Sequence, residues 1–268
     1  MADPFQDVDA AGADFITMFA DAMDMRQSDP TMEAIVADYL DRLDQTDVTR
    51  IVEIGAGAGA VSRRIAARFP VARVTGFEPS EGFVKEARSR AAGVDNLSFE
   101  VADGAALPVA EDSVDAVVIH TVLSHVTDPF PILKEALRVL RPGGRIAVCD
   151  ADFSKGSFAS FPNDPLDSLA RTFVSDFVTD AYIVGKLRGL LTGVGLAVDH
   201  FQLWNRLTDG APMMLPWVEV TTKQMVERGQ IGAGLRDALI EEHNRRVAAK
   251  TLYGFQLFAT AIGTKPQM

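Results

Sequence analysis

Short apolar runs alternate with amphipathic stretches through the first 150 residues, and the alternation predicts strands and helices in turn. The run at 114–120 (VDAVVIH) is almost continuously apolar and β-branched, as expected for a strand covered on both faces of a parallel sheet. Four more strands are expected, at 51–54, in the run ending at Glu78, at 97–101 and at 145–150. Five strands alternating with four helices predict an α/β, doubly wound sheet.

Two amphipathic helices are predicted ahead of the first strand. Asp29-Pro30 supplies a plausible N-cap and first helical position for the second of them. Their apolar residues recur at helical spacing and are Phe15, Ile16, Met18, Phe19, Ala22 and Met23, then Met32, Ile35, Val36, Tyr39, Leu40 and Leu43. Such helices either cover one edge of the core, with their acids as a solvated face, or form a lid over a ligand, and the pattern leaves both open.

After residue 150 the regular alternation lapses. Residues 151–180 carry five phenylalanines among Ser, Asp and Pro, which indicates a loop and a short helix over the carboxyl edge of the sheet. A helix at 181–192, a strand at 196–203, helices within 209–250 and a strand at 252–262 follow. The economical interpretation is one domain over 1–268: an N-terminal helical lid (1–47), a cofactor-binding core (48–204), a helical insertion (205–250) and a last strand (251–268).

Composition and charge exclude several classes of function. The chain has 268 residues, 47% of them hydrophobic, and a formal net charge of -11, which argues against binding to nucleic acid or to anionic lipid. A small neutral or cationic partner is easier to accept. Cys149 is the single cysteine, in an apolar run, so no internal disulfide or multi-cysteine metal site is expected. No apolar run approaches a membrane span and the acidic start is no signal peptide, so we expect a cytoplasmic protein without a metal. A homo-oligomer is left open.

A glycine-rich turn follows the first strand. The segment 55–59 (GAGAG) lets a ligand approach the backbone closely, and the helix after it offers free N–H groups. Glu78 ends the next strand, where a carboxylate can accept hydrogen bonds from both ribose hydroxyls of an adenosine. Because Gly55, Gly57 and Ala60 also satisfy G-x-G-x-x-G/A, these residues alone leave a dinucleotide such as NAD open.

Six motifs in order resemble the class I S-adenosylmethionine-dependent methyltransferases, most closely the small-molecule branch with the ubiquinone and menaquinone enzymes. They are VEIGAGAG (52–59), GFEPS (76–80), ADGAALP (102–108), SVDAVV (113–118), HVTDP (125–129) and RVLRPGG (138–144). An NAD enzyme has no reason to carry the Leu-x-Pro and Pro-Gly-Gly signals. The resemblance covers 48–204 and implies a Rossmann-like, mostly parallel seven-stranded sheet whose last strand, before 263–266, is antiparallel.

The resemblance also implies roles for single residues, with S-adenosyl-L-methionine as the cofactor. The glycines would border its methionine part, Glu53 would lie near its ammonium, Glu78 would hold the ribose, and Asp103 would accept from the adenine amino group. A cationic sulfonium is favoured beside carboxylates. The implied cofactor-binding residues are Glu53, Gly55, Ala56, Gly57, Gly59, Glu78, Pro79, Asp103, Gly104 and Ala105.

The expected reaction is methyl transfer to the O, C or N of a small, hydrophobic metabolite. His125 follows the central strand at the carboxyl edge of the sheet and is the candidate general base; weaker options are His120, Asp150, Asp152 and Tyr182. A hydrophobic acceptor is suggested by Phe15, Phe19, Phe153, Phe158, Phe161, Met213, Met214 and Trp217. Two alternatives stay open: a cyclase or other non-methylating catalyst that keeps the cofactor pocket, and a non-catalytic partner subunit.

Overall fold

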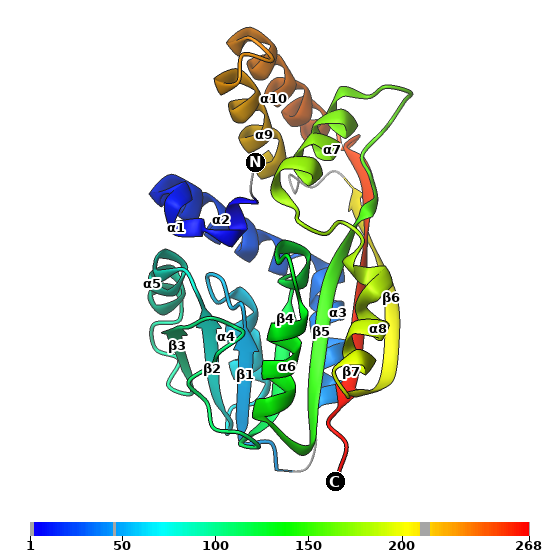
Figure 1. Ribbon diagram of the computed structural model, residues 1–268. Helices are drawn as coiled ribbons and strands as arrows, with labels where there is room; N and C mark the ends of the chain where they lie inside the picture. Colours follow the sequence, from blue (N-terminus) through cyan, green and yellow to red (C-terminus); the bar gives the residue numbers. More distant parts are fainter. Residues whose placement is uncertain (1–2, 45–46, 210–214, 268) are drawn as a thin grey trace.

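A single seven-stranded sheet forms the centre of the computed structural model, which describes residues 3–44, 47–209 and 215–267. The first five strands in the chain are parallel, and β7 runs antiparallel to both of its neighbours, which confirms the predicted fold (Figure 1). In spatial order the strands are β3 (Leu97–Val101), β2 (Arg73–Glu78), β1 (Arg50–Ile54), β4 (Val114–His120), β5 (Leu140–Ser157), β7 (Tyr253–Thr264) and β6 (Ala197–Asp209).

Helices cover both faces of the sheet and one of its ends (Figure 1). Three of them, α4, α5 and α6, separate the five parallel strands; α3 precedes the first strand, and a loop joins β3 to β4. Asp29 caps α3 as predicted, accepting from the N–H groups of Thr31 at 2.9 Å and Met32 at 3.2 Å. The helices are η1 (Pro4–Gln6), α1 (Val8–Ala11), α2 (Ala13–Gln27), α3 (Pro30–Leu43), α4 (Ala60–Arg68), α5 (Glu81–Arg90), η2 (Leu123–His125), α6 (Phe130–Val139), α7 (Pro165–Phe177), α8 (Ile183–Gly193), α9 (Leu215–Glu227) and α10 (Ala233–Ala248).

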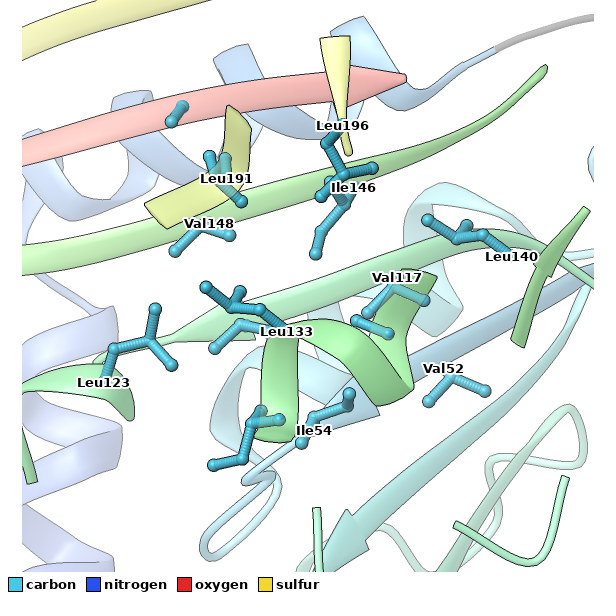
Figure 2. Packing of buried hydrophobic residues seen from close by; sticks show 14 of the residues in the cluster. Val52, Ile54, Val117, Leu123, Leu133, Leu140, Ile146, Val148, Leu191 and Leu196 are labelled. Carbon is cyan, nitrogen blue, oxygen red and sulfur yellow. The ribbon is translucent and has the colours of Figure 1, made fainter. Parts of the chain in front are cut away.

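Strand β4 lies between two hydrophobic cores, as its continuous apolar sequence predicted. Val117 and Ile119 point into the core shared with α6 and α8, whereas Ala116 and Val118 point into the core shared with α3 and α4. Figure 2 shows the first core, with Leu133 of α6 set among side chains of the sheet. Burial on both faces explains why this strand lacks an alternation of polar and apolar residues.

Shortening one central side chain should measurably weaken this core. Ile119 of β4 is fully buried, so Ile119→Val removes one methylene group and leaves a small empty space in the core. We expect the free energy of unfolding, measured by urea denaturation, to fall by about 1 kcal/mol. Val71→Ala, at a position that is 89% exposed, is the control and should change it by less than about 0.5 kcal/mol. Equal effects of the two substitutions would contradict the packing described.

Strand β5 is longer than the sequence analysis predicted. The segment 151–157 was expected to be loop, yet it continues β5: Ala151 pairs with Phe258, and Ser157 pairs with Phe255. That interpretation was wrong because the antiparallel partner that satisfies these backbone groups lies about 100 residues later in the chain. The short helix expected in this stretch is α7, which Asp164 caps. Strand β6 likewise extends to Asp209, since β7 pairs with it over its whole length.

Ion pairs hold the N-terminal helices against the sheet's helices. Asp24 of α2 contacts Arg63 of α4 and lies 2.6 Å from Arg90 of α5, and Asp21 lies 2.7 Å from Arg90. Asp9 accepts hydrogen bonds at the start of α5, from the Ser80 hydroxyl and the N–H groups that follow it. Asp9 and Asp21 are exposed and Asp24 is half-buried, so these acids face solvent and also attach the N-terminal helices to the core. In the described part of the chain no helix is long and apolar enough to cross a membrane.

Candidate cofactor and substrate site

A cavity of about 290 Å³ lies where the parallel strands β1, β2 and β4 end, at the carboxyl edge of the sheet. The N-terminal segment closes its other side with Phe5, Gln6, Val8 and Met23. Seven of the residues predicted for the site line this cavity: Gly55, Gly57, Glu78, Pro79, Asp103, Gly104 and His125. The parallel topology explains why motifs far apart in the chain meet here.

The other four predicted residues lie behind or beside the lining. Glu53 is buried and accepts a hydrogen bond from the Ser62 hydroxyl of α4. Ala56 is buried and packs against Gly76, and Gly59 begins α4 beside Phe99. Ala105 donates its N–H to Asp103 at 2.9 Å. These residues shape the glycine loop and the Asp103 turn, and the direct cofactor contact foreseen for them stays a prediction.

The Glu78 carboxyl group is fixed beside the glycine loop. Its Oε2 accepts from the Gly57 N–H at 2.9 Å, and its Oε1 accepts from the Ser80 N–H at 3.1 Å. Each carboxylate oxygen has a second acceptor site, so both can still receive a hydrogen bond from a ligand. Burial raises the pKa of Glu78 to about 7, against the opposing effect of these two backbone donors. The group is therefore half-ionised near neutrality until a ligand favours its charged form.

Glu53 is a second buried carboxyl group under the same loop. Burial raises its pKa to about 8; the Ser62 hydroxyl opposes this change, and the nearby Glu78 charge adds to it. Two adjacent acids in a water-poor site resist being ionised together. A bound cation beside them would favour the charged forms of both.

Met23 of α2 rests on the glycine loop. A Cβ atom at Gly57 would lie 2.8 Å from the Met23 sulfur, and Gly57 also has a φ of +52°, which side-chain-bearing residues rarely adopt. The loop needs glycine here first for its backbone conformation; the contact with Met23 adds a smaller effect, because the end of a methionine side chain can shift.

Replacing this glycine should weaken ligand binding through both effects. We expect Gly57→Ala to lower the affinity for S-adenosylhomocysteine about tenfold, measured by calorimetry, and Met23→Ala in the same chain to restore part of it. Gly93→Ala is the matched control, because Gly93 has a φ of +87° but open space around it. That control should lose stability and keep its affinity. A Gly57→Ala variant that binds normally would show that α2 does not constrain the loop.

Thr121 directly follows β4 and lies at the junction of this cavity with a second one. Its φ of +52° is unusual for a β-branched residue, and its N–H donates to the Cys149 carbonyl at 2.7 Å. Strained backbone of this kind is common at ligand sites. Thr121 was not predicted from the sequence, because nothing in the composition of the preceding strand indicates its backbone angle.

His125 also lies at the junction and lines both cavities. Its Nδ1 lies 2.8 Å from Oδ2 of Asp3, whose side chain is almost fully buried and also accepts from the N–H and hydroxyl of Thr179. A carboxylate at Nδ1 favours the tautomer in which Nε2 is free to accept a proton. The sequence analysis found His125 but missed Asp3, which is more than 100 positions away.

The weaker candidates for the base lie elsewhere. His120 is buried with Nδ1 3.2 Å from the Tyr39 hydroxyl, and burial holds its pKa well below the usual range. Asp150 is buried and accepts from the N–H groups of Ser124 and Ala151. Asp152 accepts from Ser154, and Tyr182 is 63% exposed. None of these four lines the junction of the two cavities.

The second cavity, of about 120 Å³, has an aromatic wall and shares Phe5, Met23, Thr121 and His125 with the first. Its remaining described lining is Phe19, Ala22, Met25, Arg26, Ala151, Phe153, Phe173, Arg206, Trp217, Gln256 and Phe258.

Only part of the predicted aromatic set lines this second cavity. Phe19, Phe153 and Trp217 do so, while Phe158 lines a third, neighbouring cavity of about 230 Å³. Phe15 packs inside a hydrophobic cluster and Phe161 is 52% exposed. Met213 and Met214 lie outside the described residues.

Comparison with known proteins agrees with this geometry. Residues 52–148 match the family described as a methyltransferase domain. The demethylmenaquinone methyltransferase of Clavibacter sepedonicus is 44% identical over 101 residues, which are 38% of this chain and 40% of that protein. An uncharacterized 37.1 kDa protein in transposon TN4556 of Streptomyces fradiae is 30% identical over 210 residues, 70% of this chain and 60% of that protein. The chain thus spans less than two thirds of the length of either relative.

A solved structure extends the likeness beyond the matched segment. The phosphoethanolamine N-methyltransferase 2 of Haemonchus contortus, in complex with S-adenosyl-L-methionine, has a TM-score of 0.55 and 16% sequence identity and covers 87% of this chain and 53% of that one. At this identity the likeness concerns the fold alone. Residues 52–148 thus match a methyltransferase-domain family, and the solved structure shows that a fold of the same kind extends over most of the chain.

Proposed function

We propose that the protein transfers a methyl group from S-adenosyl-L-methionine to the O, C or N atom of a small, largely hydrophobic metabolite. The observation that carries this proposal is the pair of adjoining cavities. One is lined by Gly57, Glu78 and Asp103, the other has an aromatic wall, and Thr121 and His125 lie between them. The whole chain would act as one domain with the boundaries predicted from the sequence, and the segment 1–47 would serve as its lid.

The residues of the first cavity fit the proposed cofactor. Glu78 keeps spare acceptor sites for two ribose hydroxyls, and the exposed Asp103 carboxylate at the cavity's edge can accept from an adenine amino group. The glycine loop has no side chain where the methionine part would pass. A ligand with a sulfonium and an ammonium group would also offset the difficulty of ionising Glu53 and Glu78 together.

The N-terminal lid supports the proposal through the residues it supplies. Phe5, Val8 and Met23 come from this segment and complete the wall of the first cavity. Asp9, Asp21 and Asp24 attach it to the starts and sides of α4 and α5 by charged contacts. Ion pairs near the protein surface contribute little stability each, so such attachments can break and re-form without loss of the core beneath them.

For the chemical step, the protein mainly has to align the acceptor with the methyl group of the cofactor. The cofactor, when bound, supplies a carbon already activated by its sulfonium. Phe153, Trp217 and Phe258 hold the acceptor's apolar body and exclude water, and the junction at Thr121 fixes its direction of approach. Where the acceptor loses a proton, Nε2 of His125 takes it, and Asp3 at Nδ1 stabilises the positive charge that results.

A product assay tests this function. The protein is incubated with S-adenosyl-L-methionine and a panel of isoprenoid, polyketide and aromatic acceptors, and mass spectrometry follows S-adenosylhomocysteine and methylated product together. Formation of both, and the loss of both in Glu78→Ala, supports methyl transfer. Tight cofactor binding with acceptor conversion but no S-adenosylhomocysteine would support a non-methylating catalyst instead. Failure of the wild-type protein to bind the cofactor would remove the proposal.

A further inference from the structure

Two arginine side chains line the otherwise apolar second cavity with incomplete hydrogen bonding. Arg206 of β6 is 7% exposed; among the described residues its Nη2 has no hydrogen-bond partner, and its Nε has only Asp29 Oδ2, at 3.5 Å. Arg26, near the end of α2, donates from Nη2 to the Thr121 hydroxyl at 2.9 Å, but its buried Nε has no partner in the described part of the chain. Buried guanidinium groups are ordinarily paired, because removing their charge from water is strongly unfavourable.

The nearby carboxylates do not satisfy all the hydrogen-bond donors of these two arginines. Asp29 caps α3 with Oδ1, and its Oδ2 lies 3.5 Å from Arg206 Nε, which is an ion pair but a long one and leaves Arg206 Nη2 without a partner among the described residues. Asp150 favours the charge of Arg26, yet its oxygens accept from the N–H groups of Ser124 and Ala151. Burial, together with the neighbouring charge of Arg206, lowers the pKa of Arg26 to about 10. The cavity thus brings two positive groups together and leaves several donors open.

Building on the proposed function, we propose that the acceptor carries an anionic group, a carboxylate or a phosphate, and that Arg26 and Arg206 bind it in the second cavity. A planar guanidinium presents paired N–H donors that match the oxygens of either anion. The aromatic wall then holds the apolar body of the same molecule. Since Arg26 also contacts Thr121 at the junction, the anchor lies beside the point where the acceptor would meet the cofactor.

An anionic acceptor differs from the neutral or cationic partner that the overall charge of the chain suggested. An overall charge of -11 favours neutral or cationic partners at long range. Inside the cavity, however, the two arginines set the local potential, and exposed acids on the surface are screened by solvent and salt. The expected acceptor is amphipathic, with one anionic end and one apolar or aromatic end.

Three probes with one apolar body test the anchor: 3-phenylpropionate, 3-phenylpropyl phosphate and 3-phenylpropan-1-ol. Each is titrated by calorimetry into the full chain, with and without saturating S-adenosylhomocysteine. We expect at least one anion to bind about tenfold or more tightly than the alcohol. Preference for the carboxylate or for the phosphate then distinguishes the two sources of charge. Equal binding of all three probes, or no saturable binding of either anion at millimolar concentration, would overturn the proposal.

Variants separate the anchor from general effects on folding. Arg26→Gln and Arg206→Gln should each weaken anion binding about tenfold and leave binding of the alcohol nearly unchanged. Arg206→Lys keeps the positive charge but loses the paired N–H donors of the guanidinium. Its anion affinity should therefore lie between those of the wild type and Arg206→Gln. Arg188→Gln, on an exposed residue of α8 that stacks over Phe201, is the matched control. Anion affinity that both glutamine variants retain would also overturn the proposal.

The proposed function and this inference can fail separately. S-adenosylhomocysteine binding reports on the first cavity, and the anion panel without it reports on the second. If Arg206→Gln does not fold, as judged by its thermal melt, Arg26→Gln and Arg206→Lys still decide the question. If S-adenosylhomocysteine binds normally but the anions bind no more tightly than the alcohol, only the proposed role of Arg26 and Arg206 is contradicted.

Discussion

Glu78→Ala should lower the affinity for S-adenosylhomocysteine about 100-fold. The carboxyl group is buried beside the glycine loop, and its two oxygens would each accept from a ribose hydroxyl. Hydrogen bonds to a charged group contribute about 1.5–3 kcal/mol each, so losing two of them outweighs any gain from the space created. The substitution also frees the Gly57 and Ser80 N–H groups, which removes the positioning of the loop. Calorimetry at pH 8 measures the change.

Glu100→Ala provides the control for this substitution. Glu100 lies on the neighbouring strand β3 and pairs in register with Phe77, one residue before Glu78, but its side chain is exposed. Its loss should change the affinity by less than about twofold. A Glu78→Ala variant that folds normally and binds as tightly as the wild type would remove Glu78 from the site.

Cofactor affinity should rise about tenfold between pH 6 and pH 8. Burial raises the pKa of Glu78 to about 7, so the free protein holds mostly the protonated form at the lower pH and mostly the ionised form at the higher one. Only the carboxylate accepts from both hydroxyls, so binding at pH 6 must release a proton. Because Glu53 has a pKa of about 8, it adds to the same trend if the ligand's ammonium lies near it.

Rising pH should change the folding stability of the free protein in the direction opposite to its effect on cofactor affinity. A raised carboxyl pKa contributes stability that is fully present below about pH 4.5 and is lost as the pH rises through 7 and 8. The protein without ligand should therefore become less stable over this range, and ligand should stabilise it most at the upper end.

Calorimetry in two buffers of different ionisation enthalpy measures the protons released on binding. Adenosine, which has no group that titrates between pH 6 and pH 8, serves as a second ligand to exclude effects from the amino acid part. Glu78→Gln should flatten the pH profile while it keeps part of the affinity. A wild-type profile that is already flat would show that Glu78 does not change its ionisation on binding.

Local signals in the chain predicted many of the residues that line the first cavity. The turn at 55–59, the acid at Glu78 and the turn at Asp103 each follow an apolar run, and parallel strands bring such ends to one edge. The antiparallel last strand was implied by the resemblance, and the structure confirms it. Its place between β5 and β6 was not predicted. The length of β5 did not follow from local pattern, because its outer half depends on pairing with a distant strand.

The missing parts of the site share one feature. Asp3, Arg26, Thr121 and Arg206 were not predicted as parts of the site, and each acquires its role from a residue far away in the sequence. Asp3 matters because it meets His125, and Arg26 because it shares a cavity with Arg206. The sequence pattern within a single helix or strand does not predict contacts between residues so far apart in the chain.

By itself, the sequence determined the alternating α/β architecture and the edge of the sheet where a nucleotide-like ligand would bind. Hydrophobic periodicity and glycine-rich turns act over a few residues, so they can be read directly from the chain. Only the tertiary structure decided that the N-terminal acids attach α2 to the core, that Met23 rests on the glycine loop, and that two buried arginines face an aromatic cavity. Those features depend on packing and charge between segments up to 180 residues apart, as with Arg26 and Arg206, and arise when the sheet brings these segments together.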